Sequence, residues 1–344
     1  MEQILLAYGI PNETVEAIMM LYNNTQATVR SPDGDTEFFD SLAGVLQGDT
    51  LAPFLFVICL DYVLRTSVDN NSNLGLTLTD SNSRRYPATT ITDADYADDL
   101  ALMSDTIYDA EVLLHSLERA AGDIGLFVNA GKTEYISFKQ DGAMKTLANK
   151  PLKSVDTFTY LGSNIASTEQ DVNIRTGKAR GALDGLNTIW KSKLPDDIKR
   201  EFFCAIVVSV LVYGSNAWTL TKRLESKLDG TFTRMLRAVL NISWKKHPTK
   251  KRMYGHLPPI SDVIRERRTR FAGHCWRSHD EIIRDVLLWP PKHGHTRVGR
   301  PYKTFIKQLC EDTGCQPEDL PQAMEDRGVW WDRVKIIRAI STTG

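Results

Sequence analysis

The feature that most constrains this chain is a pair of adjacent carboxylates, Asp98 and Asp99, between two segments that favour β-structure. Ile91 and Tyr96 belong to the segment before the pair, and the apolar run 100–103 follows it. Because Asp tolerates the dihedral angles of tight turns, the pattern predicts two antiparallel strands with the pair at or beside their connection. Neighbouring strand residues point to opposite faces, so we expect one carboxylate to face a cleft and the other to support it. Paired carboxylates supply the hard oxygen ligands that divalent cations prefer, which indicates chemistry on phosphates.

Three further stretches stand in order around this pair. They are Gly44–Phe56, which contains Gln47-Gly48, Gly125–Glu134, which contains Lys132, and Phe158–Ser163, which contains Tyr160-Leu161-Gly162. An isolated pair of aspartates is usually a solvated turn, whereas four such stretches in one order and at compact spacing are specific. The series closely resembles motifs B, C, D and E in the palm of the reverse transcriptases of non-LTR (LINE-like) retrotransposons.

The resemblance implies an α+β fold class. A partial polymerase palm, in which helices pack on a small antiparallel sheet, is expected over residues 1–165. An all-helical thumb is expected over residues 166–243, and a basic helical C-terminal region over 244–344.

The apolar spacing predicts individual elements within this plan. One helix is expected to begin at Asn12, which should cap it, and another is expected from about Asp49 to Ser67. A further helix is expected to begin at Thr106, and a series of helices is expected from Asp171 onward. Short strands are expected at 28–30, 37–39, 127–128 and within 152–165, and a polar surface loop over 69–82.

The resemblance assigns roles to matching positions only. Asp98 and Asp99 correspond to catalytic carboxylates that bind metal ions. Gln47, Gly48 and Tyr96 correspond to contacts with the nucleotide or template. Many relatives have Arg before this Gln, and Leu46 takes that place here, so a contact made by that Arg is not expected.

The resemblance also implies roles for two later stretches, and each role has an ordinary structural explanation as its alternative. Lys132 is expected near the nucleotide phosphates, where it would donate a proton to the leaving group, although a lone surface lysine is commonly just solvated. Tyr160, Leu161 and Gly162 correspond to the primer grip, in which glycine permits close approach of a primer strand. An ordinary hairpin glycine is the alternative.

For cofactors and partners, the resemblance implies Mg²⁺ (or Mn²⁺), an RNA template, a DNA primer at a nicked target and deoxynucleoside triphosphates. The implied reaction is RNA-directed DNA synthesis by nucleotidyl transfer with two metal ions. In the family the first catalytic aspartate lies on a strand upstream, in motif A. No Asp near Met1 has a strand-like context, so we expect motif A and most of the fingers to be missing and the chain alone to be inactive. The alternative function is a catalytically dead remnant that only binds nucleic acid.

The region after residue 244 is rich in cations, and aromatic residues such as Trp244 and Trp276 alternate with them. Cations follow phosphates and aromatic rings stack on bases, so this region is a candidate nucleic-acid surface, with a solvated helix face as the alternative. The stretch Gly294–Pro301 resembles a Gly-Arg-Pro segment near the end of such retroelement polyproteins. The candidate nucleic-acid-binding residues are Lys245, Lys246, Lys250, Lys251, Arg252, Arg267, Arg268 and Arg270.

Composition excludes several classes of protein. Only five cysteines occur in 344 residues, too few and too scattered for a disulfide scaffold. A zinc site from Cys275, His279, Cys310 and Cys315 is conceivable, but no Cys-x₂-Cys pair is present, and buried thiols are the simpler interpretation. No signal peptide or membrane segment is evident, so we expect an intracellular protein, nuclear or cytoplasmic, that contacts no membrane. The oligomeric state stays open.

Overall fold

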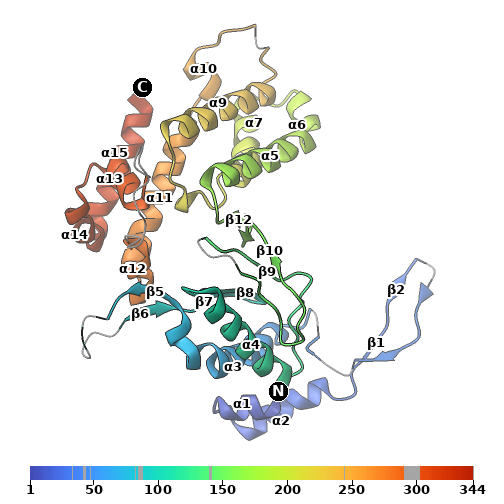
Figure 1. Ribbon diagram of the computed structural model, residues 1–344. Coiled ribbons are helices and arrows are strands. Elements are labelled where there is room, and N and C mark those ends of the chain that lie inside the picture. Colours follow the sequence, from blue (N-terminus) through green and yellow to red (C-terminus); the bar gives the residue numbers. More distant parts are fainter. Residues whose placement is uncertain are drawn as a thin grey trace. The chain divides into compact units, whose positions relative to one another are not determined.

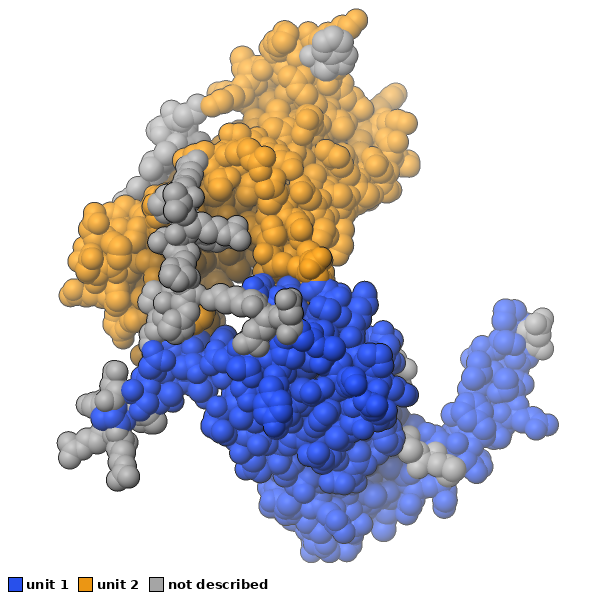
Figure 2. Space-filling view, viewed as in Figure 1, with its two compact units in different colours: residues 1–155 blue, residues 156–344 orange. Residues whose placement is uncertain are grey.

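The computed structural model describes the chain except residues 33, 42–43, 47, 82, 84–87, 139–141, 244, 290–302 and 344, and the side chains of residues 336 and 338–343. Residues 1–155 form one unit and residues 156–344 a second (Figure 2). Each unit has its own apolar clusters, and the architecture mixes helices with small sheets, as an α+β fold requires. None of the described helices combines the length and apolarity needed to cross a bilayer.

The first unit begins with two helices, α1 (Glu2–Ala7) and α2 (Asn12–Tyr22), separated by Gly9 in a positive-φ conformation. The prediction that Asn12 caps α2 was wrong: Pro11 occupies the N-cap, and the Asn12 side chain instead donates a hydrogen bond to Glu16. Short strands follow and form two antiparallel pairs, with the inner pair lying between the two strands of the outer pair in the chain. These strands are β1 (Gln26–Ala27) with β4 (Phe39–Asp40), and β2 (Arg30–Ser31) with β3 (Gly34–Asp35).

Helix α3 (Ala52–Ser67) is central to the first unit. Its Leu55 packs with Leu5 and Val15, whereas the side chain of the neighbouring Phe54 is exposed. Its far end packs against α4 (Ile107–Asp123), where Val63 meets Leu117. As predicted, Thr106 caps α4 by accepting a hydrogen bond from the Asp109 amide at 3.0 Å.

The remaining strands of the first unit are short. The expected polar loop at 69–82 was only partly right, because it contains the 3₁₀ segment η1 (Asp69–Leu74) and the strand β5 (Leu76–Thr79), which pairs with β6 (Thr89–Ile91). The hairpin β7 (Asp93–Tyr96) and β8 (Asp99–Leu102) follows. No strand forms at 127–128, where the Phe127 side chain is 85% exposed; instead β9 (Glu134–Tyr135) pairs in parallel with β10 (Lys153–Ser154).

The second unit is mainly helical and opens with the hairpin β11 (Thr159–Tyr160) and β12 (Ser163–Asn164) (Figure 1). Helix α7 (Asp196–Phe202) continues through a π-helical segment, η2 (Phe203–Val208), into α8 (Ser209–Leu211). The other elements, in order, are α5 (Thr168–Gly185), α6 (Asn187–Lys191), η3 (Ser215–Ala217), α9 (Lys222–Val239), α10 (Lys250–Tyr254), α11 (Ile260–Trp276), α12 (Glu281–Leu287), α13 (Phe305–Thr313), η4 (Pro317–Asp319), α14 (Leu320–Glu325) and α15 (Arg327–Thr343).

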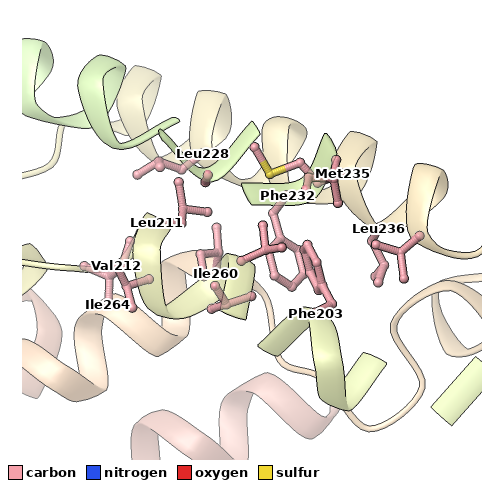
Figure 3. Close-up of a cluster of buried hydrophobic side chains, with 14 of the residues drawn as sticks. Phe203, Leu211, Val212, Leu228, Phe232, Met235, Leu236, Ile260 and Ile264 are labelled. Atoms are coloured by element: carbon pink, nitrogen blue, oxygen red, sulfur yellow. The ribbon is translucent and has the colours of Figure 1, made fainter. Parts of the chain in front are cut away.

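The main apolar core of the second unit lies where α9 meets the helix formed by α7, η2 and α8 (Figure 3). The apolar stripe of α9 is buried, from Leu224 to Val239. Phe203 and Phe232 stack in a tilted arrangement with ring centroids 5.4 Å apart. A smaller cluster joins α11, α13 and α14 around Leu309, Leu320 and Trp330.

The boundary between the units lies after Val155, whereas the sequence placed a domain boundary after residue 165. The difference has a physical cause. The β11–β12 hairpin is hydrogen-bonded to α5, so it packs with the helices that follow it.

We expect Phe203→Ala to lower the free energy of unfolding of the second unit by about 3–5 kcal/mol, because it deletes a fully buried ring. Its neighbour Phe202 is 39% exposed, so Phe202→Ala should cost about 1 kcal/mol or less. Urea unfolding followed by tryptophan fluorescence measures both, because all seven tryptophans lie in this unit. Equal losses in the two variants would contradict the packing described.

Candidate active site

The two aspartates lie on the β7–β8 hairpin, and the pairing of its strands fixes their places. Tyr96 is directly opposite Asp99, which leaves Ala97 and Asp98 as a two-residue turn. Ala97 has a φ of 54°, a positive value at the first turn position of the kind that tight hairpin turns need. Asp98 therefore lies at the tip of the hairpin, and Asp99 is the first residue of the returning strand.

The two faces of this hairpin differ in chemistry. Residues directly opposite each other in an antiparallel pair share a face. Leu100 and Leu102 pack against the apolar cluster of α3 and α4, so that face is directed to the interior of the unit. Asp99 and Tyr96 share the other face, where the Tyr96 side chain is 67% exposed. The hairpin thus presents a carboxylate and an aromatic ring together on its outward face.

Two more aspartates lie on the inner face of β7. Asp93 is opposite Leu102 and Asp95 is opposite Leu100. Although Asp95 as a residue is exposed, desolvation of its carboxyl group raises its pKa to about 8. A hydrogen bond that the protonated Asp95 donates to Asp93, and the negative charge of Asp93, act in the same direction. These two carboxyl groups lie on the opposite face of the hairpin from Asp99.

A third nearby acid, Asp105, is already engaged in the first unit. Its Oδ2 accepts hydrogen bonds from the Thr77 amide at 3.1 Å and the Thr77 hydroxyl at 2.7 Å. Asp105, which follows the hairpin in the chain, therefore holds the start of β5 in place.

The loop before α3 contains the residues that the sequence assigned to nucleotide or template contact. Gln47 lies outside the described residues, while Gly48 is exposed with a φ of 94°. Asp49 anchors this loop, because it accepts hydrogen bonds from the Tyr22 hydroxyl at 2.5 Å and the Leu51 amide at 3.1 Å. The bond to Asp49 raises the pKa of Tyr22 to about 12. Sequence inspection missed both residues, since their partnership spans two elements.

Lys132 belongs to the same unit and is exposed. It lies in a turn, where its amide donates a hydrogen bond to the Asn129 carbonyl at 2.9 Å, and no strand leads into it. Its role near nucleotide phosphates remains a prediction.

The β11–β12 hairpin carries the residues predicted as a primer grip. Tyr160 pairs with Ser163 across a turn made of Leu161 and Gly162, whose φ values are 46° and 79°. Positive φ at both central residues is typical of a type I′ turn, which suits the twist of a hairpin. The turn residues are therefore placed at the tip of a short, well-defined hairpin in the second unit.

Four side chains that sequence inspection missed fix this hairpin to its helices. Asp171 Oδ1 accepts from the Asn164 amide at 3.1 Å and Oδ2 from Trp218 Nε1 at 2.7 Å. Arg175 donates to the Gly162 carbonyl, and its guanidinium carbon lies 4.2 Å from the centroid of the Tyr213 ring. The Tyr213 hydroxyl donates to the Leu161 carbonyl at 3.0 Å. The sequence offers little sign of this arrangement, because the Asp and the Arg stand in a polar stretch of α5 and only the structure shows that they are buried.

The basic residues of the second unit divide into two groups. Arg268 contradicts its predicted role in phosphate contact: its side chain is fully buried, and its Nε donates to Asp312 Oδ2 at 2.7 Å. The partner is far away in sequence, so a charge count alone treated Arg268 as a surface cation. The other seven are exposed: Lys245, Lys246, Lys250, Lys251, Arg252, Arg267 and Arg270.

Three of the cysteines considered for zinc have largely apolar surroundings. Cys315 is buried with Leu309 and Leu320, and Cys310 packs beside it. Burial raises the pKa of the Cys275 and Cys310 thiols. Across the described part of the chain, no three His, Cys, Asp or Glu side chains are grouped to hold a metal ion. The segment Gly294–Pro301 lies outside the described residues, as does Trp244.

Comparisons with known proteins bear on these sites. Residues 3–165 match the family described as reverse transcriptase (RNA-dependent DNA polymerase). A transposon-derived protein of Caenorhabditis elegans is 25% identical over 225 residues, which cover 61% of this chain and 81% of that protein.

Two Pol polyproteins are also similar. That of the type-2 retrotransposable element R2DM of Drosophila melanogaster is 28% identical over 177 residues, which are 48% of this chain and 16% of the polyprotein. That of the type-1 retrotransposable element R2 of Bradysia coprophila is 28% identical over 167 residues, 45% of this chain and 18% of the polyprotein. The chain thus matches less than a fifth of either polyprotein.

We expect Asp95→Asn to change how stability depends on pH. The folded state holds the Asp95 proton up to a pKa of about 8, far above the ordinary value of 3.8, so this residue stabilises the fold at low pH and loses that contribution as the pH rises from about 4 to about 8. Asn has no proton to lose. Relative to the unmodified chain, Asp95→Asn should therefore gain thermal stability at pH 9 compared with pH 5.

Thermal unfolding followed by far-UV circular dichroism at the two pH values tests this expectation. Asp123→Asn, at the exposed end of α4, is the matched control and should show no such gain. If Asp95→Asn differs from the unmodified chain by the same amount at both pH values, the pKa of Asp95 is not raised in the folded state.

Proposed function

We propose that this chain acts in RNA-directed DNA synthesis as part of a non-LTR retrotransposon polymerase, because residues 3–165 match the reverse transcriptase family and the chain is similar to two R2 Pol polyproteins. The observation that carries this proposal is the pairing of Tyr96 with Asp99, which sets Asp98 in the hairpin turn. This register puts two carboxylates and one exposed aromatic ring where a nucleic acid can approach them.

The hairpin fits the divalent metal ion that such a reaction requires. Asp98 and Asp99 offer hard carboxylate oxygens at an exposed turn, and Mg²⁺ prefers such ligands. When bound there, Mg²⁺ would lower the pKa of the primer hydroxyl and neutralise the charge of the triphosphate. Asp98 and Asp99 would hold it by their carboxylates, and Mn²⁺ suits the same donors.

Two carboxylates are too few to fill an octahedral coordination shell and to fix both reacting groups. Asp93 and Asp95 lie on the inner face of the hairpin, and Asp105 is bound to Thr77, so none of them joins the outward pair. We propose that the site is completed by a carboxylate from a further strand placed beside the hairpin. Such a carboxylate corresponds to the one that motif A supplies in the family that the chain resembles.

Other residues would position the substrates. The exposed Tyr96 ring shares the face of Asp99, where it would support the sugar or base of the nucleotide. Gly48, anchored by the neighbouring Asp49, would leave room for the template, and Gln47 would contact it. Lys132 would donate a proton to the leaving pyrophosphate.

The β11–β12 hairpin would hold the primer. Its turn carbonyls are already bonded to Arg175 and Tyr213, so the backbone of Leu161 and Gly162 is fixed before the primer arrives. Fixed geometry matters because phosphoryl transfer depends mainly on positioning and electrostatics. The exposed cations from Lys245 to Arg252 would add affinity for phosphates that falls as salt rises.

We expect primer extension on an RNA template to depend on Asp98. The unmodified chain should extend little or nothing with Mg²⁺ or Mn²⁺, because the outward pair alone holds too few ligands. A fusion that adds the upstream fingers segment of an R2 relative should extend the primer. In that fusion, Asp98→Asn should lower the rate by roughly 100-fold or more, the scale for loss of one preorganised electrostatic contact.

Asp123→Asn in the same fusion is the matched control and should leave the rate unchanged. Extension by the fusion that survives Asp98→Asn would overturn the assignment of the hairpin. Extension by the unmodified chain that Asp98→Asn abolishes would retain the hairpin but overturn the need for a further carboxylate. A fusion that binds template yet never extends would favour a remnant that only binds nucleic acid.

A further inference from the structure

A basic cavity of about 550 Å³ lies within the second unit, between α11 and α15. Its lining includes the rings of Phe271 and Trp331 and, among the described residues, no carboxylate. The lining contains His274 and four arginines, which are Arg267, Arg270, Arg277 and Arg327.

One face of α11 and its C-cap residue Arg277 supply one wall of the cavity. Arg267, Arg270, Phe271, His274 and Arg277 recur at intervals of three or four residues, so they form one stripe along the helix. The opposite face, which includes Ile264, Arg268 and Ala272, is buried. The sequence did contain this periodic signal, but a simple count of basic residues did not separate the two faces.

Helix α15 supplies the second wall and is held against α11 by a close contact. Trp330 Nε1 donates a hydrogen bond to the Thr269 carbonyl at 2.8 Å, and the indole ring lies over Gly273. A Cβ atom at Gly273 would lie 2.3 Å from ring atoms of Trp330, so only glycine permits this approach. The adjacent Trp331 ring is 38% exposed and lies 5.3 Å from the Arg270 guanidinium.

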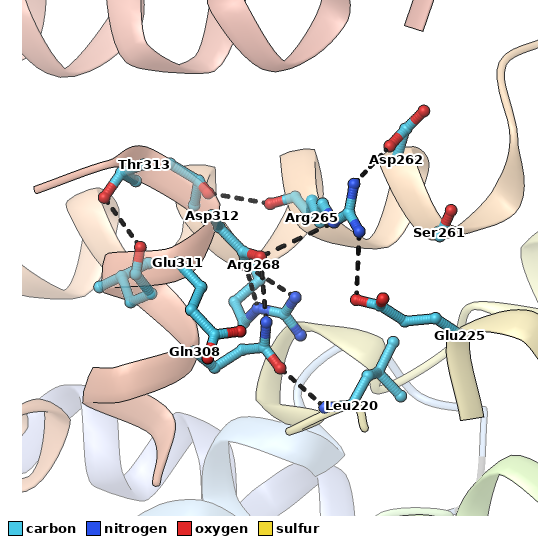
Figure 4. A network of polar contacts seen from close by, with 12 residues as sticks. Leu220, Glu225, Ser261, Asp262, Arg265, Arg268, Gln308, Glu311, Asp312 and Thr313 are labelled. Atoms are coloured by element: carbon cyan, nitrogen blue, oxygen red, sulfur yellow. Dashed lines mark hydrogen bonds and ion pairs between the residues drawn. The ribbon is translucent and has the colours of Figure 1, made fainter. Parts of the chain in front are cut away.

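A second cavity in the same unit also contains arginines, but there carboxylates compensate their charge. There Arg265 meets Glu225 at 3.2 Å, Asp262 at 2.9 Å and Asp312 at 3.8 Å, and Arg268 is bound to the same Asp312 (Figure 4). These arginines are neutralised by carboxylates from α9, α11 and α13. In the α11–α15 cavity Arg270 pairs with Glu266 at 3.3 Å, while Arg267 and Arg327 are exposed, and the described residues of the lining include no carboxylate. The cavity therefore keeps an excess of positive charge.

We propose that the α11–α15 cavity binds a segment of single-stranded nucleic acid. The arginines contact its phosphates, and Phe271 and Trp331 stack on unpaired bases. Exposed aromatic faces favour single strands, because a duplex hides the faces of its bases. The proposal rests on the proposed function only in taking a nucleic acid as substrate, and it assigns a binding site that lies in α11 and α15 and outside residues 3–165.

The test is a fluorescence anisotropy titration of the whole chain with a labelled single-stranded RNA, the same sequence as DNA, and the corresponding duplex. Trp331→Ala should weaken single-strand binding roughly 5- to 150-fold, the effect of losing one stacked base. Trp331→Phe keeps a ring and should retain most of the affinity. Arg267→Gln should reduce the slope of log affinity against log salt by about 0.7, the value for one phosphate contact on a single strand.

Arg180→Gln, at an exposed arginine of α5 outside the cavity, is the matched control and should change affinity less than about twofold. Tighter binding to RNA than to DNA, or equal binding to both, supports the site and identifies the strand that it takes. Unchanged affinity in both Trp331→Ala and Arg267→Gln, or a preference for the duplex, would overturn it. Circular dichroism melting of each variant separates a loss of binding from a loss of folding.

This outcome is independent of the polymerase test. If the fusion never extends a primer but Trp331→Ala still weakens binding, the cavity stands and the polymerase proposal fails. If extension depends on Asp98 while both Trp331→Ala and Arg267→Gln bind normally, the polymerase proposal stands and the cavity assignment fails.

Discussion

The register of the β7–β8 hairpin is the constraint on which the candidate active site depends. Because side chains alternate along a strand, a slip of one residue would exchange the two faces of the hairpin. Leu100 and Leu102 resist that slip, since they pack with Val63 and Leu117 of α3 and α4. The apolar interior thereby determines which face receives Asp99 and Tyr96. The position of a polar, outward site is thus set by hydrophobic burial on the other side of the same two strands.

The sequence predicted features whose cause is local. The helix α4 with its Thr106 cap, the buried stripe of α9 and the β7–β8 hairpin all follow from spacing and turn chemistry within a short stretch. It missed features that depend on distant partners. Arg268 is buried because Asp312 lies beside it in space, and Tyr22 holds the loop before α3 through Asp49. The strand β5 was missed because its polar surroundings conceal the buried Leu78.

Helix α11 shows how one stretch of basic sequence serves two purposes. Successive residues of a helix are about 100° apart, so Arg267 and Arg268 point in different directions. Arg268 is removed from water, which is costly unless a carboxylate compensates for it, and Asp312 does so. Arg267 stays exposed beside the α11–α15 cavity. Charge density along the chain therefore says little about binding until the helix faces are separated.

Both hairpins that carry predicted site residues contain a non-glycine residue with positive φ, Ala97 in one and Leu161 in the other. Such a conformation costs about 1–2 kcal/mol for an L-residue, so it persists only where the surroundings determine the turn. In β7–β8 the packing of Leu100 and Leu102 does this, and in β11–β12 the bond from Tyr213 to the Leu161 carbonyl does. In each case side chains of the same unit hold a strained turn in place. The strain is therefore evidence that these two turns are positioned by the fold around them rather than by their own conformational preference.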